Sequence, residues 1–376
     1  MDFNYVMDKN LKFLRFCLSD QLALPSDFLG EMNWHDLYLF ACKQSLAGIC
    51  WSGISRIYDN SGADADGGPL PNKPTGADVL EWLGIVRTIQ RRNSIVTEKS
   101  ALVSKNFLAE GFNSCVLKGQ GNALMYPDPS LRTPGDIDIW VSPENADYCA
   151  CKGVLAYCRK FVPKAKACYH HIDFVSAGDV EVEVHYRPSW LNNPVHNARL
   201  QKFFGNVSVL CFVNDTGCGF NRPTWEFNVV FQLCHIYNHI LNEGVGLRQL
   251  VDYYYLMKCR PAECDINNVV YIVNRCGLRT VAMSVAWLLE NVLGLERKYL
   301  LVPAYEKGGR FLLNEILEGG NFGKHDKRAL SGAYGNAVVS NIQRLVRDFR
   351  MFWLFPSECI SEPFFRLWHF FWRATH

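Results

Sequence analysis

The chain has 376 residues, 49% hydrophobic and 20% charged, which is ordinary for a globular protein with room for roughly two or three domains. Its formal net charge of +2 gives no strong overall field, which argues against a long nucleic-acid track. The fifteen cysteines are scattered without any C-x-x-C pair, which indicates thiols in a reducing cytoplasm and argues against a disulfide framework or a zinc site.

The first 110 residues are predicted to be helical. Residues 1 to about 58 have helical faces of mixed polarity, and MDFNYVMDKN at the start lacks the apolar core of a signal peptide. The stretch 59–78 is rich in Gly, Pro, Asn and Asp, which is typical of an exposed loop. Apolar residues then recur at helical spacing from Val79 to about Glu110, which predicts one long helix.

Residues 111–215 change to short strands and turns. The strand candidates are SCVLK (114–118), DIDIWV (136–141), YHHIDFV (169–175), VEVEVHY (180–186) and VSVLCFV (207–213). Between the first two, GQGNALMY suits a Gly-rich turn into a short helix. Ser142 followed by Pro143 is typical of a helix start. The third and fourth candidates flank SAGD and predict a β-hairpin.

Helical periodicity returns after residue 223 and persists to about residue 355. The clearest segments are TWEFNVVFQLCHIYNHIL (224–241) and LRQLVDYYYLM (247–257). This order of signals predicts an α+β fold in which a compact sheet unit lies between helical parts. The predicted regions are a helical N-terminal region at 1–110, an α/β core at 111–215 and a helical C-terminal region at 216–376.

Two carboxylates stand out on the second strand candidate. Because side chains alternate along a strand, Asp136 and Asp138 share one face, about 7 Å apart along the chain, while the apolar residues between and after them share the other. Neighbouring carboxylates repel each other unless a cation neutralises them, and Mg²⁺ is well suited to that. The alternative is an edge strand with incidental charges facing solvent.

A third carboxylate is expected from the hairpin. In VEVEVHYR the valines take one face, and Glu181, Glu183 and His185 take the other. Three carboxylates on neighbouring strands can hold two divalent ions, which activate a hydroxyl and stabilise a leaving pyrophosphate. Either glutamate is a candidate, and the alternative is a solvated hairpin face.

Two glycines in the turn after the first strand candidate suggest a phosphate-binding site. Gly119 and Gly121 follow a strand and open a helix, a geometry that directs backbone N–H groups at an anion. The pattern is not a dinucleotide-binding fingerprint, because the third glycine would fall at Leu124.

These motifs together resemble the DNA polymerase beta-like nucleotidyltransferase superfamily, and more closely a bacterial branch called uncharacterised nucleotidyltransferases. The shared features are a K-G turn, a Y-P-D-P-x-x-R loop, a G-D-x-D strand and a later acidic-x-His strand, within about residues 113–190. The resemblance implies a small mixed β-sheet nucleotidyltransferase core with helical flanks. One departure is Gln120, where the superfamily usually has Ser or Gly.

The resemblance also implies roles. Asp136 and Asp138 would bind two Mg²⁺ ions, with Mn²⁺ as an alternative, and Glu183 would be the third ligand and help to deprotonate the acceptor. Glu181 is the alternative to Glu183. The nucleotide-binding set would be Lys118, Gly119, Gln120, Gly121 and Arg132, although Lys118 has an alternative role as a structural partner of the sheet.

The implied activity is transfer of a nucleoside monophosphate from an NTP to a hydroxyl or phosphate acceptor, with release of pyrophosphate. The acceptor classes are a small molecule, a glycan precursor, a protein or an RNA end. One alternative is a catalytically inactive nucleotide-binding module, against which three mutually repelling carboxylates argue. Another is a toxin or antitoxin that works through such a domain.

The helical C-terminal region would form the far wall of the acceptor cleft. Candidates for lining this cleft are His185, His239, Arg248 and Asp252. For His235 and His239, one helical turn apart, buried or hydrogen-bonded histidines are the favoured interpretation. For His170 and His171 the favoured interpretation is hairpin surface, and the alternative is that they flank the strand of the active site.

The segment 351–376 is dense in Phe, Trp and Arg. An amphipathic helix of this kind suits a membrane surface, but Pro356 and Pro363 interrupt it, so we favour docking on the protein's own core or on a partner. No window reaches about 18 uncharged apolar residues, so no membrane-spanning helix is expected.

Overall fold

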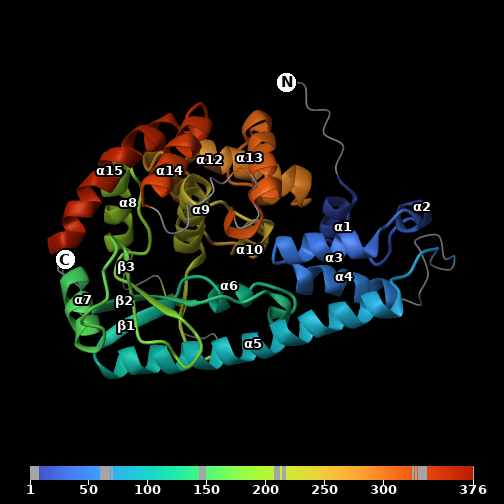
Figure 1. Cartoon of the computed structure of the whole chain (residues 1–376), viewed down its shortest axis with the longest axis horizontal. Helices are drawn as coiled ribbons and strands as arrows, with labels where there is room; N and C mark the ends of the chain where they lie inside the picture. Colours follow the sequence, from blue (N-terminus) through green and yellow to red (C-terminus); the bar gives the residue numbers. More distant parts are fainter. Residues whose placement is uncertain are drawn as a thin grey trace.

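The computed structural model describes residues 8–59, 68, 71–143, 150–206, 212–213, 217–323, 326, 328 and 337–375. Within these residues the chain is mostly helical and contains a four-stranded mixed sheet, so the α+β prediction is confirmed. Figure 1 shows a long helix, α5, along one edge of the molecule. One end of α5 lies beside the N-terminal helices and the other lies beside the sheet.

The N-terminal helices are α1 (Lys9–Leu18), α2 (Ser26–Gly30), α3 (Trp34–Lys43), α4 (Ala47–Asp59) and α5 (Gly76–Ala109). Helix α5 begins inside the predicted loop because Thr75 caps it. The Thr75 hydroxyl accepts from the Asp78 N–H at 3.2 Å, and the Asp78 carboxylate accepts from the Thr75 N–H at 2.8 Å. The rest of the predicted loop lies mostly outside the described residues.

The sheet has the order β1-β2-β4-β3. Its strands are β1 (Phe112–Val116), β2 (Ile137–Pro143), β3 (His171–Asp173) and β4 (Val182–His185). β2 pairs antiparallel with β1 and parallel with β4, while β3 and β4 form the predicted hairpin. The expected helix start at Pro143 is wrong, because Pro143 still pairs with Phe112 as the last residue of β2.

Both faces of this sheet are covered. Ile137, Ile139 and Val141 point into an apolar cluster shared with α5 and with α7 (Ala150–Phe161). On the opposite face, Trp140 stacks on Phe227 at 5.1 Å between ring centroids. The alternation predicted for β2 therefore holds, but Asp136 lies one residue before the strand.

Short elements join the strands. They are α6 (Gln120–Ala123), the 3₁₀ helix η1 (Pro129–Leu131), α8 (Pro194–Asn206), and the two-stranded pair β5 (Phe212–Val213) and β6 (Arg222–Pro223). The short helix predicted after the Gly-rich turn is α6. Of the strand predicted at 207–213, only β5 falls among the described residues.

The C-terminal region is helical, as predicted. Its helices are α9 (Trp225–Asn242), α10 (Leu247–Lys258), α11 (Ile266–Arg275), α12 (Arg279–Trp287), α13 (Glu306–Gly319), α14 (Ala337–Met351) and α15 (Pro356–Thr375). Short turns of other helix types are η2 (Leu288–Val292), η3 (Arg297–Tyr299) and η4 (Asn321–Gly323). One hydrophobic core joins α1, α3 and α4 to α9, α10, α12 and α13, so the first and last helical segments pack together.

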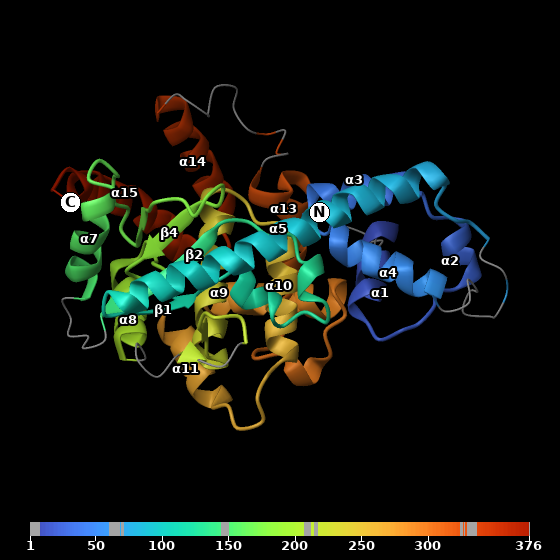
Figure 2. The ribbon, with the colours of Figure 1, turned by 90° about the horizontal axis from the view of Figure 1, so that it is seen from below.

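Figure 2 shows α5 crossing in front of the sheet, with α15 and α7 near the end of the chain and α14 projecting from the body. Among the described residues, no single helix is long and apolar enough to span a membrane. Helices α11 and α12–η2 meet the criteria of length and composition only as a pair bent by 120°.

Two helical glycines give a test of the packing that places η1. A Cβ at Gly48 of α4 would lie 2.0 Å from the Leu131 carbonyl oxygen, whereas a Cβ at Gly84 of α5 would meet nothing within 4 Å. We expect Gly48→Ala to destabilise the fold by about 1–3 kcal/mol. Gly84→Ala should instead stabilise it by about 0.5–1 kcal/mol through helix propensity.

Urea unfolding followed by circular dichroism measures both changes. Equal effects of the two substitutions would contradict close packing of α4 against η1.

Candidate active site

The parallel register of β2 and β4 brings two carboxylates together. Asp138 pairs with Glu183, and His185 follows two residues later on the same face of β4. The side chain of Glu183 is 30% exposed, whereas Asp138 is only 2% exposed. Glu181 is exposed, and its carbonyl accepts from the Ile137 N–H at 2.9 Å. The geometry therefore places Glu183, not Glu181, beside the aspartate.

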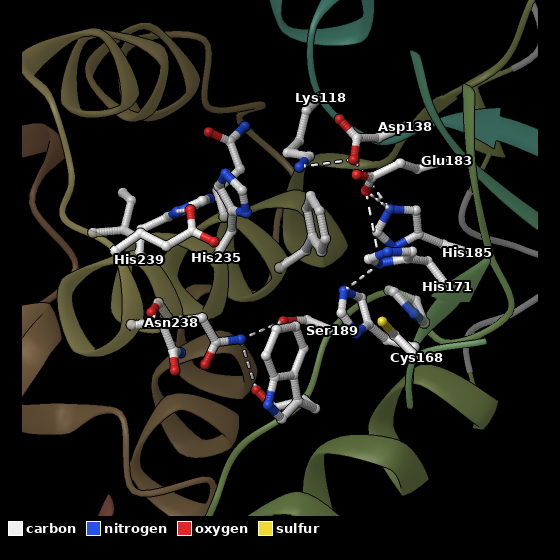
Figure 3. Close-up of a pocket in the computed structure, with 18 of the residues that line it drawn as sticks. Lys118, Asp138, Cys168, His171, Glu183, His185, Ser189, His235, Asn238 and His239 are labelled. Carbon is white, nitrogen blue, oxygen red and sulfur yellow. Dashed lines mark hydrogen bonds and ion pairs between the residues drawn. The ribbon is translucent and has the colours of Figure 1, made fainter. Parts of the chain in front are cut away.

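Two cationic side chains contact the buried carboxylate of Asp138 (Figure 3). Lys118 Nζ lies 2.8 Å and His185 Nε2 lies 3.0 Å from the same oxygen, Oδ1. Burial raises the pKa of Asp138, but the Lys118 charge and the His185 hydrogen bond outweigh it and hold the pKa well below its usual range. Burial lowers the pKa of His185, and its hydrogen bonds to Asp138 and Glu183 reverse this, to about 8. Asp138 is therefore ionised at neutral pH.

Asp136 has a different environment. The charge of Asp138, followed by burial, raises the pKa of Asp136 from 3.8 to about 6. The two aspartates thus repel each other as the sequence pattern implied, although Asp136 stands just before the strand. Added positive charge between them would relieve this repulsion.

The Gly-rich turn lies beside this carboxylate group. Gly119 has a positive φ of 53° and contributes to the cavity next to Lys118, in a conformation that a side chain would strain. The structure does not place Gln120 or Gly121 at the cavity. The Gln120 amide donates to Thr97 Oγ1 at 2.7 Å on α5, and a Cβ at Gly121 would lie 2.4 Å from the Val116 carbonyl oxygen.

A cavity of about 510 Å³ opens over the carboxylates. Lys118, Asp138 and Glu183 lie on one side, and His235 and His239 of α9 lie across from them (Figure 3). The predicted site residues that line it are Lys118, Gly119, Arg132, Asp136, Asp138, Glu183, His185, His239, Arg248 and Asp252. Folding thus gathers nearly all of the predicted residues around one space.

Arg132 and Asp252 form a buried ion pair at the edge of this cavity. Arg132 Nε donates to Asp252 Oδ1 at 2.8 Å and Nη2 to Oδ2 at 2.7 Å, while the Tyr126 hydroxyl donates to Oδ1 at 2.5 Å. Both charged residues are less than 5% exposed. The arginine expected at a phosphate therefore has a structural carboxylate partner, which ties the loop after η1 to α10.

The favoured interpretation of His170 and His171 as hairpin surface is wrong, and the alternative position beside the strand of the site is the one observed. Both line the cavity, and His170 Nε2 lies 2.7 Å from His171 Nδ1. His171 Nδ1 is also 3.7 Å from Glu183 Oε2. Burial, followed by the charge of His185, lowers the pKa of His171, which keeps this imidazole neutral at pH 7. The sequence did contain a signal for this arrangement. In the antiparallel hairpin, His171 pairs with His185 and Asp173 pairs with Glu183, so the two histidines lie side by side.

The C-terminal helices supply the far wall of the cavity, as the sequence predicted, but α14 and α15 contribute residues that no local motif indicated. Arg366, His369 and Arg373 of α15 and Arg344 of α14 line the same cavity as the carboxylates. Arg366 is held in place by Glu362, 2.8 Å away, and by Asn341 Oδ1 at 2.8 Å. This wall is largely basic, so the cavity has carboxylates on one side and cationic side chains on another.

The donor set fits a divalent ion. Asp138, Glu183 and His185 each offer one ligand atom, and these atoms lie within 4.8 Å of one another, as do those of His170, His171 and His185. Carboxylate oxygens suit Mg²⁺, and an adjacent imidazole also suits Mn²⁺. An ion here would take over from Lys118 in neutralising Asp138.

Comparison with known proteins matches the chain to a family model. Residues 30–294 match a family model described as an uncharacterised nucleotidyltransferase, which covers more than two thirds of the chain. Helices α14 and α15 lie beyond the matched range. No curated protein matches, and no solved structure matches.

The Arg132–Asp252 pair yields a stability prediction. Removing one partner of a buried pair leaves an uncompensated charge, so Asp252→Ala should cost about 3–5 kcal/mol of unfolding free energy. The double variant Arg132→Met/Asp252→Leu should recover much of this loss.

The matched control for this pair is Glu31→Ala. It breaks the exposed Lys9–Glu31 pair, also 2.8 Å long, and should cost no more than about 1 kcal/mol. Denaturant titration monitored by tryptophan fluorescence reports all three variants. A loss in Asp252→Ala no larger than in the control would contradict the buried pairing.

The raised pKa of Asp136 predicts a pH-dependent stability. Because the carboxyl holds its proton more tightly in the folded state, its ionisation destabilises the fold increasingly between pH 3.8 and about 6. With chelator present, Asp136→Asn should melt higher than wild type above pH 6, by on the order of 2 °C, and the difference should vanish near pH 4.

Differential scanning calorimetry across this pH range provides the measurement. Asp173→Asn, which removes an exposed carboxylate from β3, is the control and should show no such trend. A wild type that melts higher than Asp136→Asn at pH 7.5 in chelator would be inconsistent with repulsion between the aspartates.

Proposed function

The chain belongs to the uncharacterised nucleotidyltransferase family, and on that premise we propose that it is a Mg²⁺-dependent nucleotidyltransferase. It transfers a nucleoside monophosphate from an NTP to a hydroxyl or phosphate acceptor. The observation that carries this proposal is the in-register pair of Asp138 and Glu183 at one side of the cavity, beside the Gly119 turn. Paired carboxylates beside a glycine turn and an open cavity suit metal-assisted phosphoryl chemistry.

The residues have distinct proposed roles. Asp138 and Glu183, with Asp136 completing the set, would hold the ions, which supply Lewis-acid stabilisation of phosphate charge when bound. Lys118, already beside Asp138, would turn its ammonium to the phosphates. His239 and Arg248 line the acceptor side of the cavity.

The reaction balances within this arrangement. The acceptor oxygen forms a bond to the α-phosphorus as the bond from that phosphorus to the bridging α–β oxygen breaks, and pyrophosphate leaves. The acceptor's proton passes to Glu183. His171, neutral and 3.7 Å from that carboxylate, is placed to take the proton onward.

The site argues against one of the two alternatives, the binding module, and leaves the other open. A binding module without turnover gains nothing from burying Asp138 beside a second carboxylate, since the repulsion has to be offset by Lys118 and His185. A toxin or antitoxin activity would use the same chemistry on a protein or RNA acceptor. We place the protein in the cytoplasm, where the thirteen cysteines in the described part of the chain, all free, would stay reduced.

The first experiment tests transfer itself. The purified chain is incubated with each α-labelled NTP, Mg²⁺ and a cell extract, in parallel with Asp138→Asn. We expect label transfer by wild type and a loss of about 100-fold or more in the variant, because the main metal ligand is gone. Transfer that persists in Asp138→Asn would refute the metal-site assignment, and wild type that binds NTP without turnover would favour the binding module.

A second experiment uses the two glutamates of one strand segment as a matched pair. Glu183→Gln should lower the transfer rate by about 100-fold or more, whereas Glu181→Gln should stay within about twofold of wild type. Mn²⁺ titration followed by electron paramagnetic resonance should show weaker ion binding only in Glu183→Gln. The reverse order of effects would assign the third ligand to Glu181.

A further inference from the structure

Helix α15 is docked on the body by one face only. The Tyr169 ring contacts Phe365 and Trp368 at 5.7 and 5.6 Å between centroids. Near the start of the helix, the Glu358 carboxylate accepts from the Asn192 N–H at 2.6 Å. These contacts fix the orientation of α15 and leave its opposite face turned outward.

That outward face is apolar. Its side chains recur at helical spacing, and they are Ile360, Phe364, Leu367, Phe370 and Phe371, with the half-exposed Trp368 at the border with the docked face. Phe364 is 71% and Phe371 is 62% exposed. Of the 21 exposed large apolar side chains in the described chain, twelve lie between Ile342 and Phe371. A concentration of this kind marks an interaction surface.

The charges on α14 and α15 have one sign at the surface. The acidic side chains of both helices, Asp348, Glu358 and Glu362, are buried. The exposed charged residues are the basic Arg344 and Arg373, both of which also line the cavity. The end of α15 lies near α7 in both overall views, and the segment that follows α7 carries exposed Lys164 and Lys166. The apolar face is thus accompanied by positive charge.

We propose that the outward face of α15 is a docking surface for a bilayer that contains anionic lipid. Phe and Trp side chains suit the boundary between headgroups and acyl chains, and exposed basic side chains near the end of the helix attract anionic headgroups. A second copy of the chain is a poorer occupant, because a symmetric contact would bring the same basic residues together. Figure 1 shows α15 along the outer margin of the molecule, where a flat surface can reach it.

This surface is separate from the proposed chemistry but lies close to it. Arg366 and His369 line the cavity from the same helix whose outward side carries Phe364 and Leu367. Docking would therefore hold the cavity beside the lipid headgroups without using any of the carboxylates.

The test is flotation of the full chain with vesicles of phosphatidylcholine alone or with about 30% phosphatidylglycerol. We expect binding to the anionic vesicles, weakened by salt and at least about tenfold weaker in Phe364→Glu/Phe371→Glu. The matched control, Leu80→Glu/Leu108→Glu, changes α5 residues that are 72% and 59% exposed and should bind as wild type does.

A second readout does not depend on those variants. Brominated lipid should quench part of the tryptophan emission of wild type, and this part should be absent in Trp368→Phe. The proposal fails if wild type stays unbound with anionic vesicles, or if binding survives in Phe364→Glu/Phe371→Glu with its circular dichroism unchanged. It also fails if light scattering shows a dimer that this variant dissociates, which would make the face a self-interface.

Discussion

The rest of the site depends on the burial of one charge. Asp138 is 2% exposed on a central strand of a sheet covered on both faces, and an isolated carboxylate there would be strongly unfavourable. Lys118 and His185 compensate it from two different segments. The turn after β1, the strand β2 and the strand β4 must therefore come together for the charge to be tolerated. The same compensation keeps Asp138 ionised at the lining of the cavity.

A second buried pair extends this principle to the cavity edge. Arg132 and Asp252 are 120 residues apart in the chain, and their two hydrogen bonds join the sheet unit to α10. The floor of the cavity is thus held by salt bridges, while its other walls come from helices α9 and α15 packed on apolar cores. The ion-paired side of the cavity holds its charges in fixed positions, and the helices α9 and α15 contribute varied side chains on the other sides. Such a division suits the proposed binding of phosphates on one side and of an acceptor on the other.

The features that depend on local sequence periodicity were predicted correctly. Alternation in DIDIWV and VEVEVHY predicted that the carboxylates share one face of each strand, and the turn residues between β3 and β4 predicted the hairpin. The sequence left Glu181 and Glu183 undecided, because only the register between β2 and β4 brings Glu183 beside Asp138. It misjudged His170 and His171, since a hairpin face turns into a cavity wall only when distant helices cover it. The partner of Arg132 and the contribution of α15 likewise depend on long-range packing that no short motif records.

Helix α15 has a consequence for how such a protein can diversify. The carboxylate floor lies within the part of the chain that matches the family, whereas Arg366, His369 and Arg373 come from beyond it. The family match therefore covers one side of the cavity and leaves out the side formed by α15. Under the proposed function, substitutions on the cavity side of α15 would change which acceptor fits and leave the carboxylates in place, so related chains can share one reaction and differ in acceptor.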